Sequence, residues 1–260
     1  MARIHFFEIE DLSWCPDIVH SGVTDALRFI ADKTKGLNPI APLLRSAIQT
    51  TQTDRILDIG SGSGGPWLTL IKEIQSSDKP VKVTLTDIKP NLESFKYVSE
   101  LDKNIDFIAE PFDGTEIPES IPGFLTSFNS LHHLKPSDLK LFLENAIKQK
   151  RGIALFDGED KKLLGSLVML LSFPMLFLLI PFVRPFSKGR LFFTYIIPLI
   201  PIVILFDGIV SFLRTYSKDE LLECLGTVAG EDEYDWEVGV HRVEKNPFGI
   251  SYLIGTPKRG

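Results

Sequence analysis

A short apolar strand that runs directly into a glycine-rich turn and a helix constrains the fold of this chain more than any other feature. RILDIG (55–60) is followed by SGSGG (61–65) and by an amphipathic segment from Pro66 to Ile74. Glycine adopts positive φ without a steric penalty and allows a ligand close to the backbone, while the helix N-terminus offers free N–H groups. An ordinary strand-to-helix connection also uses glycine, so the turn predicts a nucleoside site only together with a second feature.

The alternation of strands and helices continues after this turn. Short apolar runs alternate with amphipathic segments, which favours right-handed βαβ crossovers and a parallel sheet. After a long apolar block, two segments rich in aromatic and β-branched residues predict a terminal antiparallel hairpin. The predicted strands are 55–60, 83–87, 105–110, 123–130, 152–159, 234–243 and 249–257, and the predicted helices among the parallel strands are 66–74, 90–99 and 136–148.

These elements predict an α/β domain with three layers around a seven-stranded, mostly parallel sheet. We expect the domain to occupy residues 51–260 and to follow an N-terminal helical cap at 1–50. We expect an apolar helical insertion at 161–215 within it. A chain of 260 residues is long enough for one large domain of this kind.

Asp87 is the second feature that gives the turn a functional meaning. It ends the second predicted strand, so its carboxylate belongs at the same carboxyl edge of the sheet as the glycine-rich turn. Ligands of open α/β sheets bind at that edge, and a carboxylate there can accept both hydroxyls of a ribose. The sequence therefore predicts a site for a nucleoside-containing ligand.

The segments RILDIGSGSGG, TLTD and AEPFDG together resemble the class I (Rossmann-like) S-adenosylmethionine-dependent methyltransferases. The resemblance implies S-adenosylmethionine as cofactor, with Asp58 and the turn near its methionine part, Asp87 on the ribose and Asp113 near the adenine amino group. An acid directly ahead of the glycines favours this family over a nicotinamide-dependent dehydrogenase. The expected cofactor-binding residues are Asp58, Gly60, Ser61, Gly62, Gly64, Asp87, Asp113 and Asn129.

Two adjacent histidines, His132 and His133, follow the fourth predicted strand, where the family's substrate-side motif ends. Histidine titrates near neutrality, so either ring is a candidate general base, and these two are the candidate catalytic residues. A structural or orienting role for the pair stays open, because methyl transfer to a nucleophilic acceptor needs little acid–base help once the reactants are aligned.

Two charge-free runs, Leu163 to Val183 and Leu191 to Phe206, flank a loop that carries Arg184, Lys188 and Arg190. The first run has the length of a bilayer span, about 20 residues. Prolines within both runs and the basic loop on the far side argue against a simple spanning hairpin. Three arrangements stay open: shallow docking on a membrane with the basic loop near the headgroups, an apolar lid on the domain or on a dimer partner, and a spanning hairpin.

An insertion after the fifth strand covers the reactive end of the cofactor in methyltransferases of this fold. The resemblance and the apolar composition together predict a small, lipophilic methyl acceptor, with oxygen, nitrogen and carbon all open as the methylated atom. Competing hypotheses are a non-catalytic nucleoside-binding module and a membrane-anchored scaffold with a Rossmann-like domain.

No metal site is expected from the sequence. The two cysteines, Cys15 and Cys224, lie far apart without ligand spacing. The acids at the end of the fifth strand have no histidine among them, and a solvated strand end is the preferred interpretation of Asp157, Glu159 and Asp160. Near the end of the insertion, Arg214 is expected to pair with Asp207.

The net charge of −6 gives no electrostatic footprint for nucleic acid, so a nucleic-acid partner is not expected. Glu8, Glu10 and Asp11 interrupt the N-terminal segment where a secretory signal would be apolar, which predicts a cytoplasmic protein. The insertion leaves open peripheral or integral association with the cytoplasmic face of a membrane, and a homodimer is also open.

Overall fold

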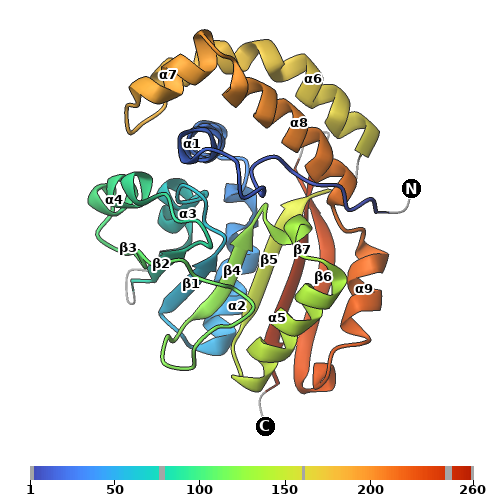
Figure 1. Ribbon diagram of the computed structural model, residues 1–260. Helices are drawn as coiled ribbons and strands as arrows, with labels where there is room; N and C mark the ends of the chain where they lie inside the picture. The colour runs from blue at the N-terminus through green and yellow to red at the C-terminus, as the bar shows by residue number, and fades with distance from the viewer. Residues whose placement is uncertain (1–2, 76–79, 160–161, 244–247, 259–260) are drawn as a thin grey trace.

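A seven-stranded sheet with the order β3-β2-β1-β4-β5-β7-β6 forms the centre of the molecule (Figure 1). The computed structural model describes residues 3–75, 80–159, 162–243 and 248–258. The predicted three-layer α/β fold with a seven-stranded, mostly parallel sheet is confirmed, including the position of the C-terminal antiparallel hairpin. The strands are β1 Arg55–Ile59, β2 Lys82–Thr86, β3 Ile105–Phe107, β4 Phe124–Phe128, β5 Ile153–Gly158, β6 Tyr234–Arg242 and β7 Gly249–Pro257.

The strand pairing explains where a ligand can bind. β1 pairs in parallel with both β2 and β4, so that the sequential order reverses between β1 and β4. Crossover helices leave a crevice at the carboxyl ends of the strands at such a reversal. β7 enters antiparallel beside β5, and β6 closes the edge antiparallel to β7.

Helices cover both faces of the sheet and bury two apolar clusters against it. α2 (Ala41–Thr51), α3 (Trp67–Ile74) and α4 (Leu92–Leu101) pack on one face, where Trp67 and Phe95 are fully buried. α5 (Pro136–Lys148) and α9 (Lys218–Leu225) pack on the other. α9 begins with a capping box in which Ser217 and Glu220 each bond the other's backbone N–H. Short 3-10 helices lie at Asn38–Ile40, Leu131–His133, Ile180–Phe182 and Glu231–Glu233.

A separate helical layer lies across the carboxyl ends of the strands (Figure 1). It consists of α1 (Asp17–Thr34) and the insertion helices α6 (Lys162–Leu179), α7 (Lys188–Tyr195) and α8 (Leu199–Arg214). Val19, Val23 and Ala26 of α1 share an apolar cluster with residues of α6 and α8. The insertion is therefore folded against the domain through α1.

A buried ion pair joins the insertion to the glycine-rich turn. Arg190 of α7 is 2% exposed, and its Nη1 lies 2.5 Å from Oδ2 of Asp25 on α1. The other carboxylate oxygen of Asp25 accepts hydrogen bonds from Ser63 in the turn and from Asn91 and Ser94 before and within α4. Arg190 therefore lies in the interior, unlike the exposed Arg184 and Lys188, because Asp25 supplies a buried carboxylate that compensates its charge.

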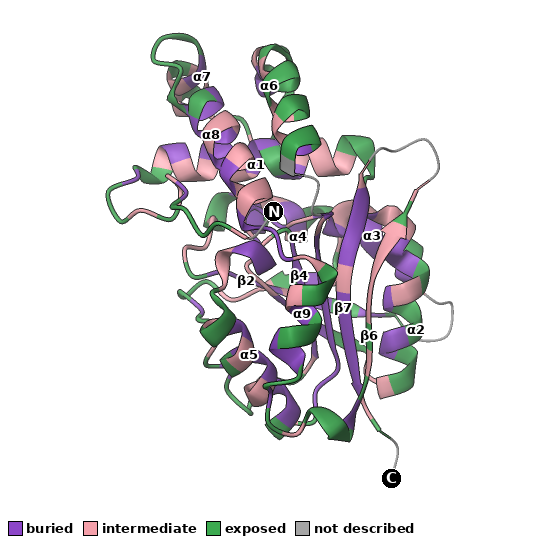
Figure 2. Ribbon diagram, turned by 90° about the vertical axis from the view of Figure 1, so that its right-hand side faces the viewer, coloured by how far each residue is buried: buried purple, intermediate pink, exposed green. Residues whose placement is uncertain are grey.

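Many residues of the insertion helices are exposed (Figure 2), and large apolar side chains are among them. Leu163 is 82% exposed, and Leu171, Leu178 and Ile196 are each exposed by about two thirds or more. Leu163–Phe182 is long and apolar enough to cross a membrane, with a mean hydropathy of 2.5. α7 and α8 satisfy the same criterion only together, and they meet at a bend of 76°.

Candidate functional site

The glycine-rich turn after β1 uses backbone conformations that favour glycine. Gly60, Gly62 and Gly64 have φ angles of 67°, 56° and 108°. A Cβ on Gly60 would lie 2.8 Å from Oγ of Ser130, so the loop after β4 packs directly on the turn. The N–H of Ser61 donates to the carbonyl of Thr86 at 2.9 Å, which ties the turn to the end of β2. The turn is thus held in one shape before any ligand binds.

Asp58 lies buried beneath this turn at the end of β1. One carboxylate oxygen accepts from Oγ1 of Thr126 at 2.6 Å and the other from Oγ of Ser61 at 2.7 Å. Burial raises the pKa of Asp58 to about 6, although these hydrogen bonds favour the charged form. Its charge is therefore responsive to any cation that enters the site.

Asp87 follows β2 and faces the turn, as the sequence predicts. Its Oδ2 accepts from the N–H of Gly62 at 2.7 Å and its Oδ1 accepts from the N–H of Lys89 at 2.9 Å. Each carboxylate oxygen has a further lone pair, so the side chain can still accept hydroxyl donors. The same residue fixes the turn and offers the expected ribose acceptor.

Asp113 and Asn129 lie at the rim of the same site. Asp113 is exposed, and its Oδ1 accepts from the N–H and Oγ1 of Thr115. Asn129 adopts a left-handed φ of 51° directly after β4, and its N–H donates to the carbonyl of Phe156. Both residues line a cavity at the carboxyl ends of the strands.

A single cavity of about 980 Å³ connects these residues with the insertion. Its wall includes the turn, Asp87, Asp113 and Asn129 on one side. On the other side it includes Met169 of α6 and Ile204 and Phe212 of α8. Ligand pockets measure about 300–1,000 Å³, so this one lies at the upper limit and has room for two ligands side by side.

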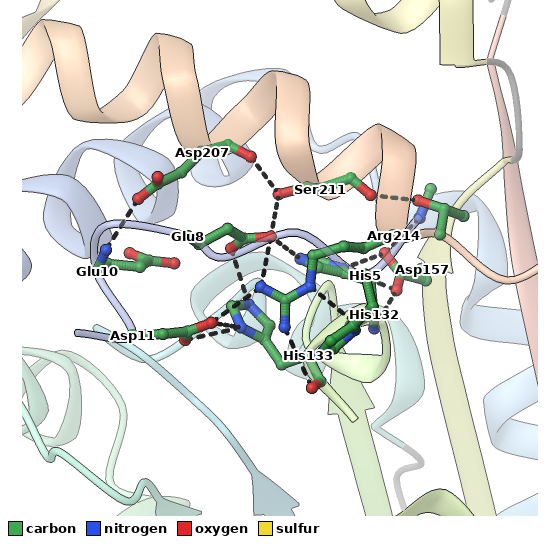
Figure 3. A network of polar contacts seen from close by, with 12 residues as sticks. His5, Glu8, Glu10, Asp11, His132, His133, Asp157, Asp207, Ser211 and Arg214 are labelled. Atoms are coloured by element: carbon green, nitrogen blue, oxygen red, sulfur yellow. Dashed lines mark hydrogen bonds and ion pairs between the residues drawn. The ribbon is translucent and has the colours of Figure 1, made fainter. Parts of the chain in front are cut away.

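Both histidines line this cavity, and Figure 3 shows them beside acidic side chains of the N-terminal segment and Arg214 of α8. Nδ1 of His132 is 2.9 Å from Oδ2 of Asp157, and Nδ1 of His133 is 2.9 Å from Oδ1 of Asp11. Burial lowers the pKa of His133, but Asp11 and the surrounding carboxylates more than compensate and raise it to about 9. With these neighbours alone, His133 is protonated at neutral pH and is a poor base.

The N-terminal segment passes over the histidine pair. Glu8 is fully buried, with its carboxylate near both rings and 3.2 Å from Nη1 of Arg214. The same nitrogen lies 2.9 Å from Asp11. The expected Arg214–Asp207 pair is wrong, because Asp207 accepts the N–H groups of Ile9 and Glu10 instead. α8 therefore clamps the segment at two points.

The acids after β5 also differ from expectation. Asp157 is 4% exposed and pairs with His132, while Glu159 is 7% exposed and pairs with Arg242. A solvated strand end is wrong for both, since each carboxylate has a basic partner in the fold. Asp160 lies outside the described residues.

Several residues of the site cannot be found from local sequence patterns. Glu8 and Asp11 come from a segment without a strand or helix signal, and Asp25 and Arg190 are far apart in the chain. Only the unusual acidity of an otherwise apolar N-terminal segment hints that it meets basic or polar groups.

Comparison of the sequence with protein-family models finds no match, and comparison with curated proteins finds none either. Solved structures give distant likenesses. Mitomycin 7-O-methyltransferase is 14% identical, with a TM-score of 0.45 over 82% of this chain and 52% of its own, so this chain spans about half its length. Magnesium protoporphyrin IX methyltransferase from Synechocystis PCC 6803 with bound SAH is 11% identical, with a TM-score of 0.46 over 86% and 84%. A SAM-dependent methyltransferase from Aquifex aeolicus is 17% identical, with a TM-score of 0.42 over 77% and 81%.

Proposed function

We propose that this chain is an S-adenosylmethionine-dependent methyltransferase that acts on a small lipophilic acceptor. The observation that carries the proposal is the single cavity between a nucleoside-type turn and an apolar lid. The turn, Asp58 and Asp87 lie at one end, and side chains of α6 and α8 lie at the other. A polar donor and an apolar acceptor would meet in the middle, at the histidine pair.

The residues present fit the cofactor. The positive-φ glycines leave the backbone of the turn open to the cavity, Asp87 retains acceptor capacity for ribose hydroxyls, and Asp58 lies under the turn where a cationic methionine part is expected. The cofactor supplies an electrophilic methyl group when bound.

The protein's contribution to the reaction is binding and alignment of two reactants in one cavity. Holding reacting groups in line accounts for a large part of the acceleration of such bimolecular steps. Met169, Ile204 and Phe212 suit an apolar body of the acceptor, while its reactive atom would lie near His132. An acceptor hydroxyl placed there has a carboxylate-supported imidazole to take its proton.

Calorimetric titration tests the cofactor class. We expect S-adenosylmethionine and S-adenosylhomocysteine to bind the purified chain and NADH not to bind. Binding of NADH without the other two would replace the proposal with a dehydrogenase. Binding of all nucleosides alike, without transfer to any apolar acceptor offered, would favour a non-catalytic binding module.

The affinity for S-adenosylmethionine should decrease below about pH 6. The raised pKa of Asp58 means that the free protein takes up a proton there, and a cationic ligand must displace it. For a single competing proton, the affinity decreases up to about tenfold per pH unit below the pKa and is constant above it. Asp58→Asn should remove this dependence between pH 5 and 7, as measured by titration at each pH. An unchanged slope in Asp58→Asn would contradict the assignment.

We further propose that the insertion docks on the surface of a membrane and thereby reaches acceptors dissolved in it. The exposed leucines of α6 and the neighbouring cations Arg184 and Lys188 support this arrangement. Apolar side chains and basic residues on one surface are typical of helices that lie in the interface of anionic bilayers. One face of α8 packs on α1, and this contact holds the insertion against the rest of the domain.

Flotation with vesicles of phosphatidylcholine and phosphatidylglycerol tests this docking. Leu171→Glu combined with Leu178→Glu should reduce the bound fraction at least about tenfold, because burial of each leucine contributes roughly 1.5–3 kcal/mol. Leu222→Glu on α9, at a leucine that is 46% exposed, is the matched control and should float normally. A wild-type chain that does not float but is dimeric in size-exclusion chromatography would indicate that a second copy covers this surface.

A further inference from the structure

Three donor atoms converge between the N-terminal segment and the loop after β4. They belong to Glu8, His132 and His133, and they lie within 4.8 Å of one another (Figure 3). Glu8 and His132 are buried, and His133 is partly buried. Two imidazoles and one carboxylate are a donor set that divalent transition metals prefer.

The spacing of these atoms is unusual for direct hydrogen bonds. Nε2 of His132 is 3.7 Å from Oε1 of Glu8, and Nε2 of His133 is 3.5 Å from Oε2. Both exceed normal N–H···O distances, which reach about 3.2 Å. Ligand atoms around a tetrahedral zinc ion with bonds of roughly 2.0–2.1 Å lie about 3.3–3.4 Å apart. The two gaps end on different oxygens of Glu8 and are slightly wider than this spacing, so a small cation between the groups requires only a small inward movement of the side chains.

Both rings are oriented for metal binding by a carboxylate behind them. Nδ1 of His132 bonds Asp157, and Nδ1 of His133 bonds Asp11, at 2.9 Å in each case. When the carboxylates accept the Nδ1 protons, each neutral ring presents a lone pair on Nε2. Carboxylate–histidine pairs of this kind are the usual outer shell of histidine metal ligands.

One carboxylate oxygen of Glu8, Oε2, lacks a hydrogen-bond donor among the described residues, although Nε2 of His133 lies 3.5 Å away. The Glu8 side chain is 0% exposed. Oε1 instead faces Nη1 of Arg214 at 3.2 Å and Oγ of Ser211 at 3.3 Å. A buried carboxylate oxygen without a donor costs free energy, and a bound cation would remove that cost.

The net negative charge around the cluster favours binding of a divalent cation. Glu8, Asp11 and Asp157 are three carboxylates in contact with the two rings, and Arg214 is the cation that contacts Glu8 and Asp11. A bound ion would displace the second proton of His133, and with both imidazoles neutral this set carries a net charge of −2, which one divalent ion would neutralise.

We propose that Glu8, His132 and His133 bind a divalent first-row transition-metal ion, with Zn²⁺ as the probe. Both histidines line the cavity, so a fourth coordination position would face the acceptor. The metal site can exist whether or not the protein transfers methyl groups. The role of the ion in the reaction rests on the proposed function. There it would lower the pKa of an acceptor hydroxyl, whose proton would pass to water, because Nε2 of His132 as a ligand would no longer act as the base. The sequence predicted no metal site, because the third ligand lies more than a hundred residues from the histidines.

The test is titration of tag-free, chelator-treated, full-length protein with Zn²⁺, followed by calorimetry, together with absorption spectra of the Co²⁺ form. We expect a single saturable site and a Co²⁺ spectrum of tetrahedral type. Glu8→Gln, which keeps the side-chain shape, should weaken Zn²⁺ binding by more than about 100-fold. Asp157→Asn should weaken it by about 10–100-fold, the usual effect of an outer-shell change.

His241→Ala on β6 is the matched control and should bind Zn²⁺ as the wild type does. Circular dichroism melting identifies any variant that fails to fold. We expect Asp157→Asn and Glu8→Gln to fold, because each replaces a carboxylate with an amide of the same shape. Absence of Zn²⁺ binding by the wild type would overturn the proposal. Binding of Zn²⁺ by Glu8→Gln and by His132→Ala with the same affinity as the wild type would also overturn it. Zn²⁺ binding without S-adenosylmethionine binding would leave this inference standing and overturn the proposed function alone.

Discussion

Replacing Asp87 with alanine should abolish measurable S-adenosylmethionine binding. The substitution removes the expected acceptor of two ribose hydroxyls and also the partner of the Gly62 N–H, which shapes the turn. Hydrogen bonds to a charged group contribute about 1.5–3 kcal/mol each, so the loss of two amounts to at least about 3 kcal/mol. That corresponds to a decrease in affinity of more than about 100-fold in calorimetric titration.

Asp106→Ala is the matched control for this experiment. Asp106 is an exposed acid on the neighbouring strand β3, and it bonds the backbone N–H of Phe107. We expect its variant to bind S-adenosylmethionine with unchanged affinity. If Asp87→Ala also bound normally, neither the ribose role of Asp87 nor the proposed location of the cofactor would stand.

The largest effect on stability is expected at Arg190. Arg190→Met leaves the carboxylate of Asp25 buried without its cation, and breaking a buried pair in this way costs about 3–5 kcal/mol. For a chain of this size each kcal/mol corresponds to roughly 2–4 °C, so the melting temperature should decrease by about 6–20 °C. Differential scanning calorimetry measures the change directly.

Two further variants isolate the ion pair in that experiment. Lys188→Met, on the first residue of the same helix, removes an exposed cation and should change the melting temperature little. Asp25→Asn combined with Arg190→Met should be more stable than Arg190→Met alone, because the amide carries no uncompensated charge. Equal melting temperatures for Arg190→Met and Lys188→Met would show that the pair contributes nothing to stability.

The sheet and the part of the site that we propose to bind the cofactor follow from local sequence. RILDIG, the glycines and Asp87 each depend on features within a few residues, namely strand periodicity, turn chemistry and the position of an acid at a strand end. The strand order then places Asp58 and Asp87 together without further information. Structure adds that Asp87 is also a backbone anchor of the turn.

The part of the site around the histidine pair, where we propose that the methyl acceptor binds, could not be predicted in the same way. The partners of His132 and His133 come from β5, from the N-terminal segment and from α8, and no sequence rule relates segments that distant. The expected Arg214–Asp207 pair failed for a related reason. Residues 207 and 214 lie on one helix, but seven positions correspond to about 10.5 Å along its axis, which is farther than an i,i+4 pair, and each side chain has its partners in the N-terminal segment instead.

The clamp of α8 on residues 8–11 has a consequence for when the surroundings of the histidine pair form during synthesis. Asp11 and Arg214 are 203 positions apart, as are Glu8 and Ser211. Contacts of such long sequence separation form late in folding, since the chain entropy of closing so large a loop must be overcome first. Residues 8–11 therefore obtain these partners only after synthesis has passed Arg214, and a nascent chain that stops before it lacks the complete histidine environment.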